Sequence, residues 1–279
     1  MSEIIYSENF DFIKKRRADI DSLERGLLCD SAKSLAAKAC DLTLDDIIEA
    51  CSSLSHGDVM VSREFCKILA GEIKDSIQRL FYDNPTDNDD EEHTQIAYLK
   101  NAFSDKAYRR FAELFPKASA AYYPGFREVC EEVYYGRCTH TILPIYSTVE
   151  GHIATFRKLI SKYDLKIVSA TDIVMSDESV MRYALLTKEL ENPGKSESLR
   201  YLELSVVVDD TIKCGEFLAA TEYLGAVVSS VTSYPLEYSE NGNLLWLQLD
   251  ITEADLTALY LFFECYQIRY TIIGAYKII

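Results

Sequence analysis

The chain has little positive charge and few histidines. Its 29 lysines and arginines stand against 45 acidic residues, which gives a formal net charge of −16 over 279 residues. Nucleic acids and anionic membranes bind basic surfaces, so neither is expected as a partner. The four histidines are scattered and lack the close spacing of metal ligands. We therefore expect no metal ion and no cofactor.

Paired cysteines and long apolar runs are also lacking. The eight cysteines form no Cys-x-x-Cys motif, and the evenly spaced Cys29, Cys40 and Cys51 have no histidine among them. Buried free thiols are the favoured interpretation, rather than disulfides or zinc ligands. No window has the length of a membrane-spanning helix, and the first ten residues lack the basic-then-apolar order of a signal peptide. We expect a soluble, cytoplasmic protein.

Two polar stretches divide the sequence. Residues 82–95 (YDNPTDNDDEEHTQ) hold six acids and a proline, and residues 189–198 (ELENPGKSES) hold proline and glycine. Such composition is typical of solvated linkers and loops. The predicted organisation is a helical segment at 1–82, an acidic linker at 83–94, an α/β segment at 95–192 and a last domain at 199–279.

The first segment has the 3.6-residue periodicity of helices. We expect Thr43 to cap a helix that ends before His56, and Ser62 to cap the next helix, over residues 62–81. One apolar stripe is predicted to pack in the core. Its residues are Ile13, Ile20, Leu23, Leu27 and Leu28.

The middle segment alternates between strands and helices, which favours a mainly parallel sheet with helices on its faces. Strands are predicted at 95–99, 139–145, 165–175 and 180–188, and helices at 104–115, 125–136 and 150–163. Residues 142–153 (ILPIYSTVEGHI) predict a strand that delivers a loop to a helix N-terminus, a common place for an anionic ligand.

The last segment predicts the order βαββαβ, which is ferredoxin-like. The strands are 200–208, 226–234, 243–251 and 268–278, the helices are 213–224 and 253–266, and SENG at 239–242 is a hairpin turn. Alternate strand residues, including Tyr201, Leu245 and Trp246, are expected to form a second apolar surface for homodimerisation.

Three stretches of the sequence resemble known families. QIAYLKNAFSDKAYRRF, the LPI…DLKIV core and VMRYALLTKE resemble prephenate dehydratase. Residues 199–279, with their final GAY and a TSYP version of the ESRP motif, resemble the ACT regulatory domain. RRADIDSLERGLL resembles the helical chorismate mutase that precedes the dehydratase in bifunctional P-proteins. The resemblance implies phenylalanine biosynthesis and an α+β multidomain fold, with an all-α segment, a truncated periplasmic-binding-like α/β lobe and an ACT-like domain.

The departures from the dehydratase pattern concern its catalytic positions. The family has a second lobe where only about a dozen residues separate Val168 from Met181 here, too few for a core. The family's Thr-Arg-Phe motif has become Met181-Arg182-Tyr183, and methionine has no proton to donate. The Glu-Asn-Ser after LPI has become Tyr146-Ser147-Thr148. Since general acid help is worth roughly 10²–10⁴-fold, we expect no useful dehydration.

The remaining candidate residues have two interpretations each. Arg182 could hold a carboxylate or form an ion pair, and Ser104 is a helix cap in preference to a ligand. Arg17 matches one mutase arginine, but a charged stripe on a solvated helix face is the favoured interpretation of KKRR. The resemblance makes Gly215, Thr232 and Ser233 candidate ligand contacts of the ACT-like domain, beside Ser147 and Thr148 in the lobe.

Three hypotheses for the function remain. The first is a catalytically degenerate relative that binds an aromatic small molecule or an aromatic-pathway enzyme. The second is an active prephenate dehydratase, chorismate mutase or both, producing phenylpyruvate for L-phenylalanine synthesis. The third is a module that serves only homodimerisation through its ACT-like domain.

Overall fold

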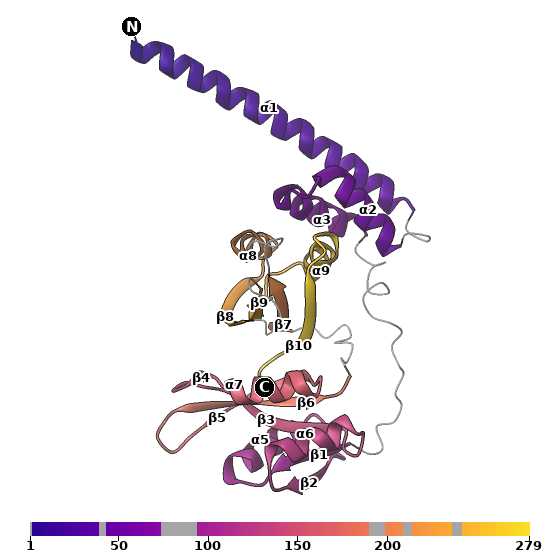
Figure 1. Cartoon of the computed structure of the whole chain (residues 1–279), viewed down its shortest axis with the longest axis vertical. Coiled ribbons are helices and arrows are strands. Elements are labelled where there is room, and N and C mark those ends of the chain that lie inside the picture. Colours follow the sequence, from indigo (N-terminus) through magenta and orange to yellow (C-terminus); the bar gives the residue numbers. More distant parts are fainter. Residues whose placement is uncertain (1, 39–42, 74–93, 190–198, 209–213, 236–241) are drawn as a thin grey trace. The chain divides into compact units, whose positions relative to one another are not determined.

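A computed structural model describes residues 2–38, 43–73, 94–189, 199–208, 214–235 and 242–279, with the backbone alone over residues 2–11 (Figure 1). Its contacts divide the chain into two compact units. The helical unit comprises Met1–Asp83, Ile212–Gly225 and Ala254–Ile268, and the sheet unit comprises Asn84–Thr211, Ala226–Glu253 and Arg269–Ile279. The last segment thus gives its helices to one unit and its strands to the other.

The helical unit consists of α1 (Ser2–Ala36), α2 (Leu44–Ser55), α3 (Val59–Ile73), α8 (Cys214–Tyr223) and α9 (Leu256–Cys265). Thr43 caps α2 in a capping box, as predicted. The Ser62 cap is wrong, because α3 begins one turn earlier. Asp58 accepts a hydrogen bond from the Met60 amide at 2.7 Å, and the Ser62 hydroxyl donates to the Asp58 carbonyl inside the helix. No helix in the described part of the chain is long and apolar enough to cross a membrane.

The apolar stripe of α1 is only partly in the core. Leu28 is 4% exposed and is buried together with Ala32 and Leu35, near the end of the helix. The four earlier members of the stripe are 53–72% exposed in the single chain, so the core prediction is wrong for them. They lie in the turns of α1 that precede its buried end; they are Ile13, Ile20, Leu23 and Leu27.

The sheet unit is built on one mixed sheet in the order β2-β1-β3-β6-β5-β10-β7-β9-β8, with the short β4 paired to β3. Its strands are β1 (Gln95–Leu99), β2 (Ser119–Tyr123), β3 (His140–Ser147), β4 (Gly151–His152), β5 (Lys166–Val174), β6 (Val180–Thr187), β7 (Tyr201–Val208), β8 (Val227–Pro235), β9 (Asn243–Asp250) and β10 (Arg269–Tyr276). A mixed α/β architecture is confirmed, but most strand pairs are antiparallel. The strand β2 was not predicted from the sequence.

Helices cover both faces of the first half of the sheet. α6 (Phe126–Tyr134) and α7 (Ala154–Lys162) contribute Val129, Val133 and Ile160 to a core that includes Ala97 of β1. α5 (Ala102–Ala112) contributes Ala107 and Phe111 to a second core with Ile96 and Tyr98. Successive β1 residues point to opposite faces, which explains why neighbours in sequence belong to different cores.

A short hairpin joins β5 and β6. The two strands pair antiparallel from Lys166↔Thr187 to Val174↔Val180, so residues 175–179 form the whole connection. The Asp177 carboxylate accepts hydrogen bonds from the Ser179 amide and hydroxyl at 3.1 and 2.6 Å. This hairpin lies where the resemblance to dehydratases implies a second lobe.

The last four strands pair in the order β10-β7-β9-β8, and every pair among them is antiparallel. With α8 and α9, the elements follow the predicted βαββαβ order. Most of the predicted hairpin turn at 239–242 lies outside the described residues, as do most of the linker at 83–94 and the polar stretch at 189–198.

Gly274, the glycine of the GAY motif, joins the two halves of the sheet. It pairs with Ile167 where β10 runs parallel to β5. A Cβ at this position would lie 2.3 Å from the Ile167 carbonyl oxygen, closer than any real contact. The close approach of two backbones therefore requires glycine here.

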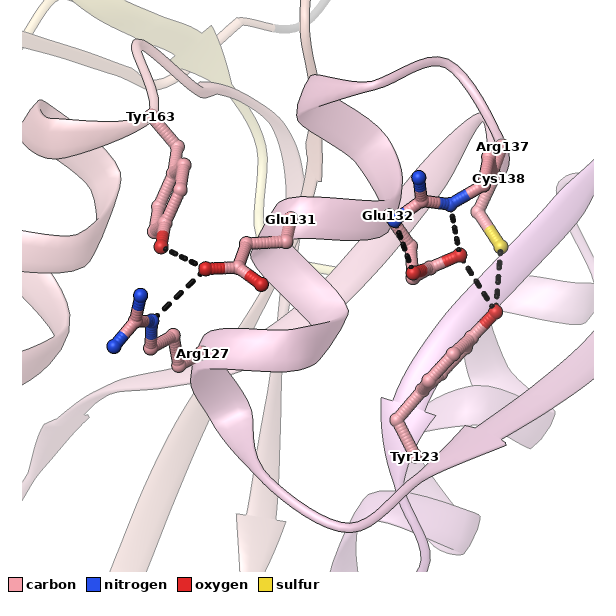
Figure 2. Close-up of polar contacts among 7 residues, drawn as sticks. All are labelled: Tyr123, Arg127, Glu131, Glu132, Arg137, Cys138 and Tyr163. Carbon is pink, nitrogen blue, oxygen red and sulfur yellow. Dashed lines mark hydrogen bonds and ion pairs between the residues drawn. The ribbon is translucent and has the colours of Figure 1, made fainter.

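Two adjacent glutamates of α6 form hydrogen bonds with side chains of the helix itself and of the segments around it (Figure 2). Glu131 accepts hydrogen bonds from Arg127 at 2.9 Å and from the Tyr163 hydroxyl at 2.8 Å. Glu132 accepts two from Arg137, at 2.8 and 2.6 Å, and one from the Tyr123 hydroxyl at 3.0 Å. Arg127 lowers the pKa of Glu131, and Arg137 lowers that of Glu132. Both carboxylates are engaged in structural contacts.

Candidate functional site

The structure brings the dehydratase-like motif residues together. β3 and β6 are antiparallel neighbours, with Tyr146 opposite Arg182 and Ser147 opposite Met181. The Thr148 amide extends the ladder by donating to the Val180 carbonyl at 3.0 Å. Two sequence stretches more than 30 residues apart therefore meet at one end of a strand pair.

The chain turns back where a loop leading directly to a helix N-terminus was predicted, and anion binding by this loop stays a prediction. β4 pairs with the end of β3, and α7 begins only at Ala154, with no side chain capping it. The Ser147 hydroxyl accepts a hydrogen bond from the Glu150 amide at 2.9 Å. The Thr148 hydroxyl accepts one from the Val180 amide at 3.0 Å. Both hydroxyl groups stabilise backbone.

The guanidinium of Arg182 forms an ion pair within the sheet. Its Nε and Nη2 donate to the two carboxylate oxygens of Asp172 at 2.7 and 2.9 Å. Its Cζ lies 5.5 Å from the ring centre of Tyr146 and 5.9 Å from that of Tyr201. Of the two interpretations of Arg182, the structure contains the ion pair, in the planar two-point geometry that arginine favours.

A second guanidinium, that of Arg157 on α7, is more deeply buried. Its side chain is 3% exposed, and its Cζ lies 4.9 Å from the Trp246 ring centre. One terminal nitrogen donates to the Thr232 hydroxyl at 2.8 Å and the other to Glu203 at 3.4 Å. Its Nε is buried without a hydrogen-bond partner among the described residues. Thr232 is therefore bonded to the protein itself.

Glu203 collects three donors in the interior. Besides Arg157, the Trp246 indole N–H donates to one carboxylate oxygen and the Tyr276 hydroxyl donates to the other, the latter at 2.8 Å. Gln248 in turn donates to the Tyr276 hydroxyl at 2.9 Å. Burial and the Glu203 charge raise the pKa of Tyr276. The tyrosine of the GAY motif is thus part of a buried, charge-neutralising network.

His152 is close enough to both arginines for their charges to affect it. Its Nε2 lies 2.9 Å from the Ser230 hydroxyl, and its ring packs edge-on against Tyr146 with centres 5.3 Å apart. Its buried Nδ1 has no hydrogen-bond partner in the described part of the chain. Burial, followed by the charges of Arg157 and Arg182, lowers the pKa of His152 to about 4. The imidazole is therefore neutral at pH 7.

The other candidates do not join this cluster. Asn101 caps α5 by accepting from the amides of Phe103 and Ser104, so the Ser104 cap is wrong and its buried hydroxyl lies within the helix. Ser233 is exposed on β8. Gly215 and Arg17 belong to the helical unit, where Arg17 is exposed and a Cβ on Gly215 would meet nothing within 4 Å.

The prediction of an apolar dimer surface is wrong for two of its residues, because they are buried inside the chain. Trp246 and Leu245 are 2% and 4% exposed. Trp246 shares a core cluster with Ile160 of α7, and Tyr201 packs at its border. The sheet unit thus covers Trp246 with its own helix, in line with the cation–π contact from Arg157.

Sequence reasoning missed Arg157, His152 and Glu203. One signal was present: Arg157 falls on the apolar face of α7, between Ile153 and Ile160 in helical spacing. A charged residue at a core position needs a buried partner. The partner itself, Glu203, is 46 residues away, so no local pattern could have identified it.

Comparison with known proteins is consistent with this fold. Residues 96–181 match the family model of prephenate dehydratase. No curated protein matches the chain. The structure of prephenate dehydratase from Streptococcus mutans is similar with a TM-score of 0.55 and 18% identity, over 66% of this chain and 98% of that one.

Two further structures have a similar fold. One is described as GqqA, a novel type of quorum quenching acylase, with a TM-score of 0.51, 20% identity and coverage of 65% of this chain and 94% of that one. The other is prephenate dehydratase from Arthrobacter aurescens in complex with L-Phe, with a TM-score of 0.50, 12% identity and coverage of 66% and 90%. The chain therefore contains a prephenate-dehydratase-like segment in a mixed α/β fold.

Proposed function

We propose that this chain is a prephenate-dehydratase-like protein related to phenylalanine biosynthesis that no longer dehydrates prephenate and acts by binding a ligand or a partner. The observation that carries the proposal is the Arg182–Asp172 fork, the ion pair in which both carboxylate oxygens of Asp172 accept hydrogen bonds from Arg182. It neutralises the one cation of the Met181-Arg182-Tyr183 motif from within the chain. A substrate carboxylate would have to displace Asp172 to use it.

The side chains around this fork argue against dehydration. Dehydration requires a proton donor for the departing hydroxyl, and Met181 has none. His152, whose ring packs against Tyr146, is neutral with its Nε2 beside the Ser230 hydroxyl. Without general acid help, a rate loss of roughly 10²–10⁴-fold is expected from this one term.

A spectroscopic assay of phenylpyruvate formation from prephenate tests the proposal. We expect no enzyme-dependent rate, with a competent prephenate dehydratase as the positive control. The Met181→Thr variant should stay inactive, because the β5–β6 hairpin leaves no second wall for the substrate. Turnover near that of the positive control would refute the proposal and restore the alternative, an active dehydratase.

Chorismate mutase activity is expected to be absent or very low. Arg17 is exposed on α1 and is the one residue that matches a mutase arginine. Electrostatic catalysis of this rearrangement needs several fixed cations around the substrate. Chorismate consumption that disappears in Arg17→Ala would contradict this and would assign the helical unit a catalytic role.

The last four strands support an ACT-like module. Their order and pairing are ferredoxin-like, and the Arthrobacter aurescens structure contains L-Phe. We infer an aromatic amino acid as the ligand class and weak binding of phenylalanine, because Thr232 is already bonded to Arg157. Calorimetric titration of the full chain tests this. Tight, saturable phenylalanine binding would favour a regulated enzyme.

Homodimerisation through this module is the accompanying proposal, together with docking of an aromatic-pathway enzyme. β8 is an edge strand of the sheet, at the end opposite β2, and Val227 and Val231 on it are 61% and 44% exposed. Exposed edges with apolar residues favour pairing with another chain. Sedimentation of the full chain should give a dimer that Val231→Lys converts to a monomer. A monomeric wild-type chain at micromolar concentration would contradict this.

A further inference from the structure

Three cysteines converge in the helical unit. Cys51 lies on α2, Cys66 on α3 and Cys265 at the end of α9, and their sulfur atoms all lie within 4.8 Å of one another. The three side chains are 1%, 0% and 6% exposed. α3 contacts both α2 and α9, so the cluster is set by the packing of three helices (Figure 1). Neither the dehydratase-like segment nor the proposed function involves it.

The spacing of the three sulfurs suits a metal ion. Two sulfurs that bind one ion at about 2.3 Å each lie roughly 4 Å from one another. The sulfurs of the three cysteines, all within 4.8 Å of one another, are therefore close enough to share an ion. The three sulfurs come from helices α2, α3 and α9, each of which contacts the other two, so the three atoms meet at one point in the interior. No histidine or carboxylate belongs to the group among the described residues.

We propose that Cys51, Cys66 and Cys265 form a three-thiolate site for one soft, thiophilic metal ion. Thiolates select ions such as Cu(I) or Zn(II) over hard cations. Three sulfurs satisfy a three-coordinate ion, or leave the fourth position of Zn(II) to a water molecule or a small thiol. On binding, each thiol forms a bond to the metal and releases its proton to solvent, with no change of oxidation state.

The site joins parts of the chain that are distant in sequence. Cys51 and Cys66 lie on consecutive helices, whereas Cys265 is near the C-terminal end of the chain. A bound ion would therefore close a long loop, and such closures restrict the unfolded chain more than short ones do. Binding should raise the unfolding temperature of the full chain, and the free energy of unfolding should increase with the logarithm of the ion concentration once that concentration exceeds the dissociation constant.

Cd(II) and Zn(II) added to the reduced, metal-free full chain test the proposal. We expect one Cd(II) per chain by native mass spectrometry, a thiolate-to-metal charge-transfer band in the ultraviolet, and a higher unfolding temperature. Cys66→Ser should weaken binding by at least about 10–100-fold, the loss typical of removing even a supporting residue. Cys130→Ser removes an equally buried thiol of the sheet unit and should leave binding unchanged.

The wild-type chain also provides a readout that does not depend on a variant folding. Alkylation in a mild denaturant, followed by peptide mass spectrometry, should find Cys51, Cys66 and Cys265 protected by Cd(II) and Cys130 unprotected. The absence of a charge-transfer band, or protection spread over other cysteines, would overturn the proposal. An unchanged affinity in folded Cys66→Ser would overturn it as well.

Discussion

Arg157 and Arg182 lie in the same sheet unit, but their charges are neutralised in different surroundings. The Arg157–Glu203 pair is 3% and 2% exposed, with a distance of 3.4 Å and one guanidinium nitrogen unbonded. The Arg182–Asp172 pair is 17% and 35% exposed, with two short bonds. The better geometry thus belongs to the more hydrated pair. Sequence resemblance pointed to that pair, whereas the more deeply buried charges belong to the other.

This difference has an energetic consequence. Two charges removed from water depend on each other, because a partner that disappears leaves an uncompensated buried charge. Partly exposed charges are solvated when a partner is lost, and solvent also screens their attraction. The two pairs should therefore respond very differently to the same kind of substitution.

Glu203→Gln should have the largest effect. It leaves the Arg157 charge buried and places an amide where three donors converge, so we expect a loss of about 3–5 kcal/mol in the free energy of unfolding. Urea denaturation followed by circular dichroism measures it. The double variant Arg157→Met/Glu203→Gln should recover part of the loss. A loss of about 1 kcal/mol or less in the free energy of unfolding is typical of an exposed ion pair. If Glu203→Gln alone loses no more than this, the two pairs do not differ.

Gly274→Ala should come next, because it disturbs the strand that delivers Tyr276 to Glu203. The added Cβ meets the Ile167 carbonyl oxygen, and overpacking of this kind costs typically about 1–3 kcal/mol. Thermal unfolding measures the loss. Gly215→Ala is the matched control, since a Cβ there meets nothing within 4 Å, and it should be neutral or slightly stabilising.

How far the sequence predicts this structure depends on the range of the interactions. Periodicity and turn residues are local, so the sequence predicted the Thr43 cap and the βαββαβ order correctly. β2 was missed because SAAYY is short and three of its five residues are small. The exposed stripe of α1 was misread because periodicity reveals an apolar face but not what covers it.

The candidate site depends on contacts between distant segments. Tyr146 and Arg182 could be paired in advance only through the resemblance, which supplied the order of strands. Arg157 and Glu203, or the three cysteines of the helical unit, have no fixed spacing. The close approach at Gly274 explains the glycine of the GAY motif, but only the strand pairing identifies Ile167 as its neighbour.

The pH dependence of stability tests His152, which the charges of both arginines affect. Unfolded His152 binds a proton below pH 6.5, whereas the folded form has a pKa of about 4. The unfolded state is therefore favoured progressively as the pH falls from 6.5 to 4. After allowance for solvent screening, this should cost about 1–2 kcal/mol across that window.

The His152→Gln variant should flatten this part of the stability curve, measured by urea denaturation at several pH values. His56→Asn is the matched control, because His56 is exposed and adopts a left-handed conformation that asparagine tolerates. It should retain the wild-type slope. Equal slopes for wild type and His152→Gln would mean that His152 binds a proton as readily in the folded state as in the unfolded state, despite the charges of the two arginines.

Asp172→Asn should have the smallest effect, and it tests the more exposed of the two ion pairs. Arg182 loses a charged acceptor but keeps the Tyr146 and Tyr201 rings, and its hydration rises, so we expect a loss of no more than about 1 kcal/mol. The variant also frees the guanidinium for an added carboxylate. If the fork is what prevents this position from binding anions, phenylpyruvate or prephenate should raise the unfolding temperature of Asp172→Asn more than that of wild type. Equal shifts would mean that these ligands do not bind Arg182 in the wild type or in the variant. The buried cluster around Arg157 would then be the better candidate for an anion-binding site.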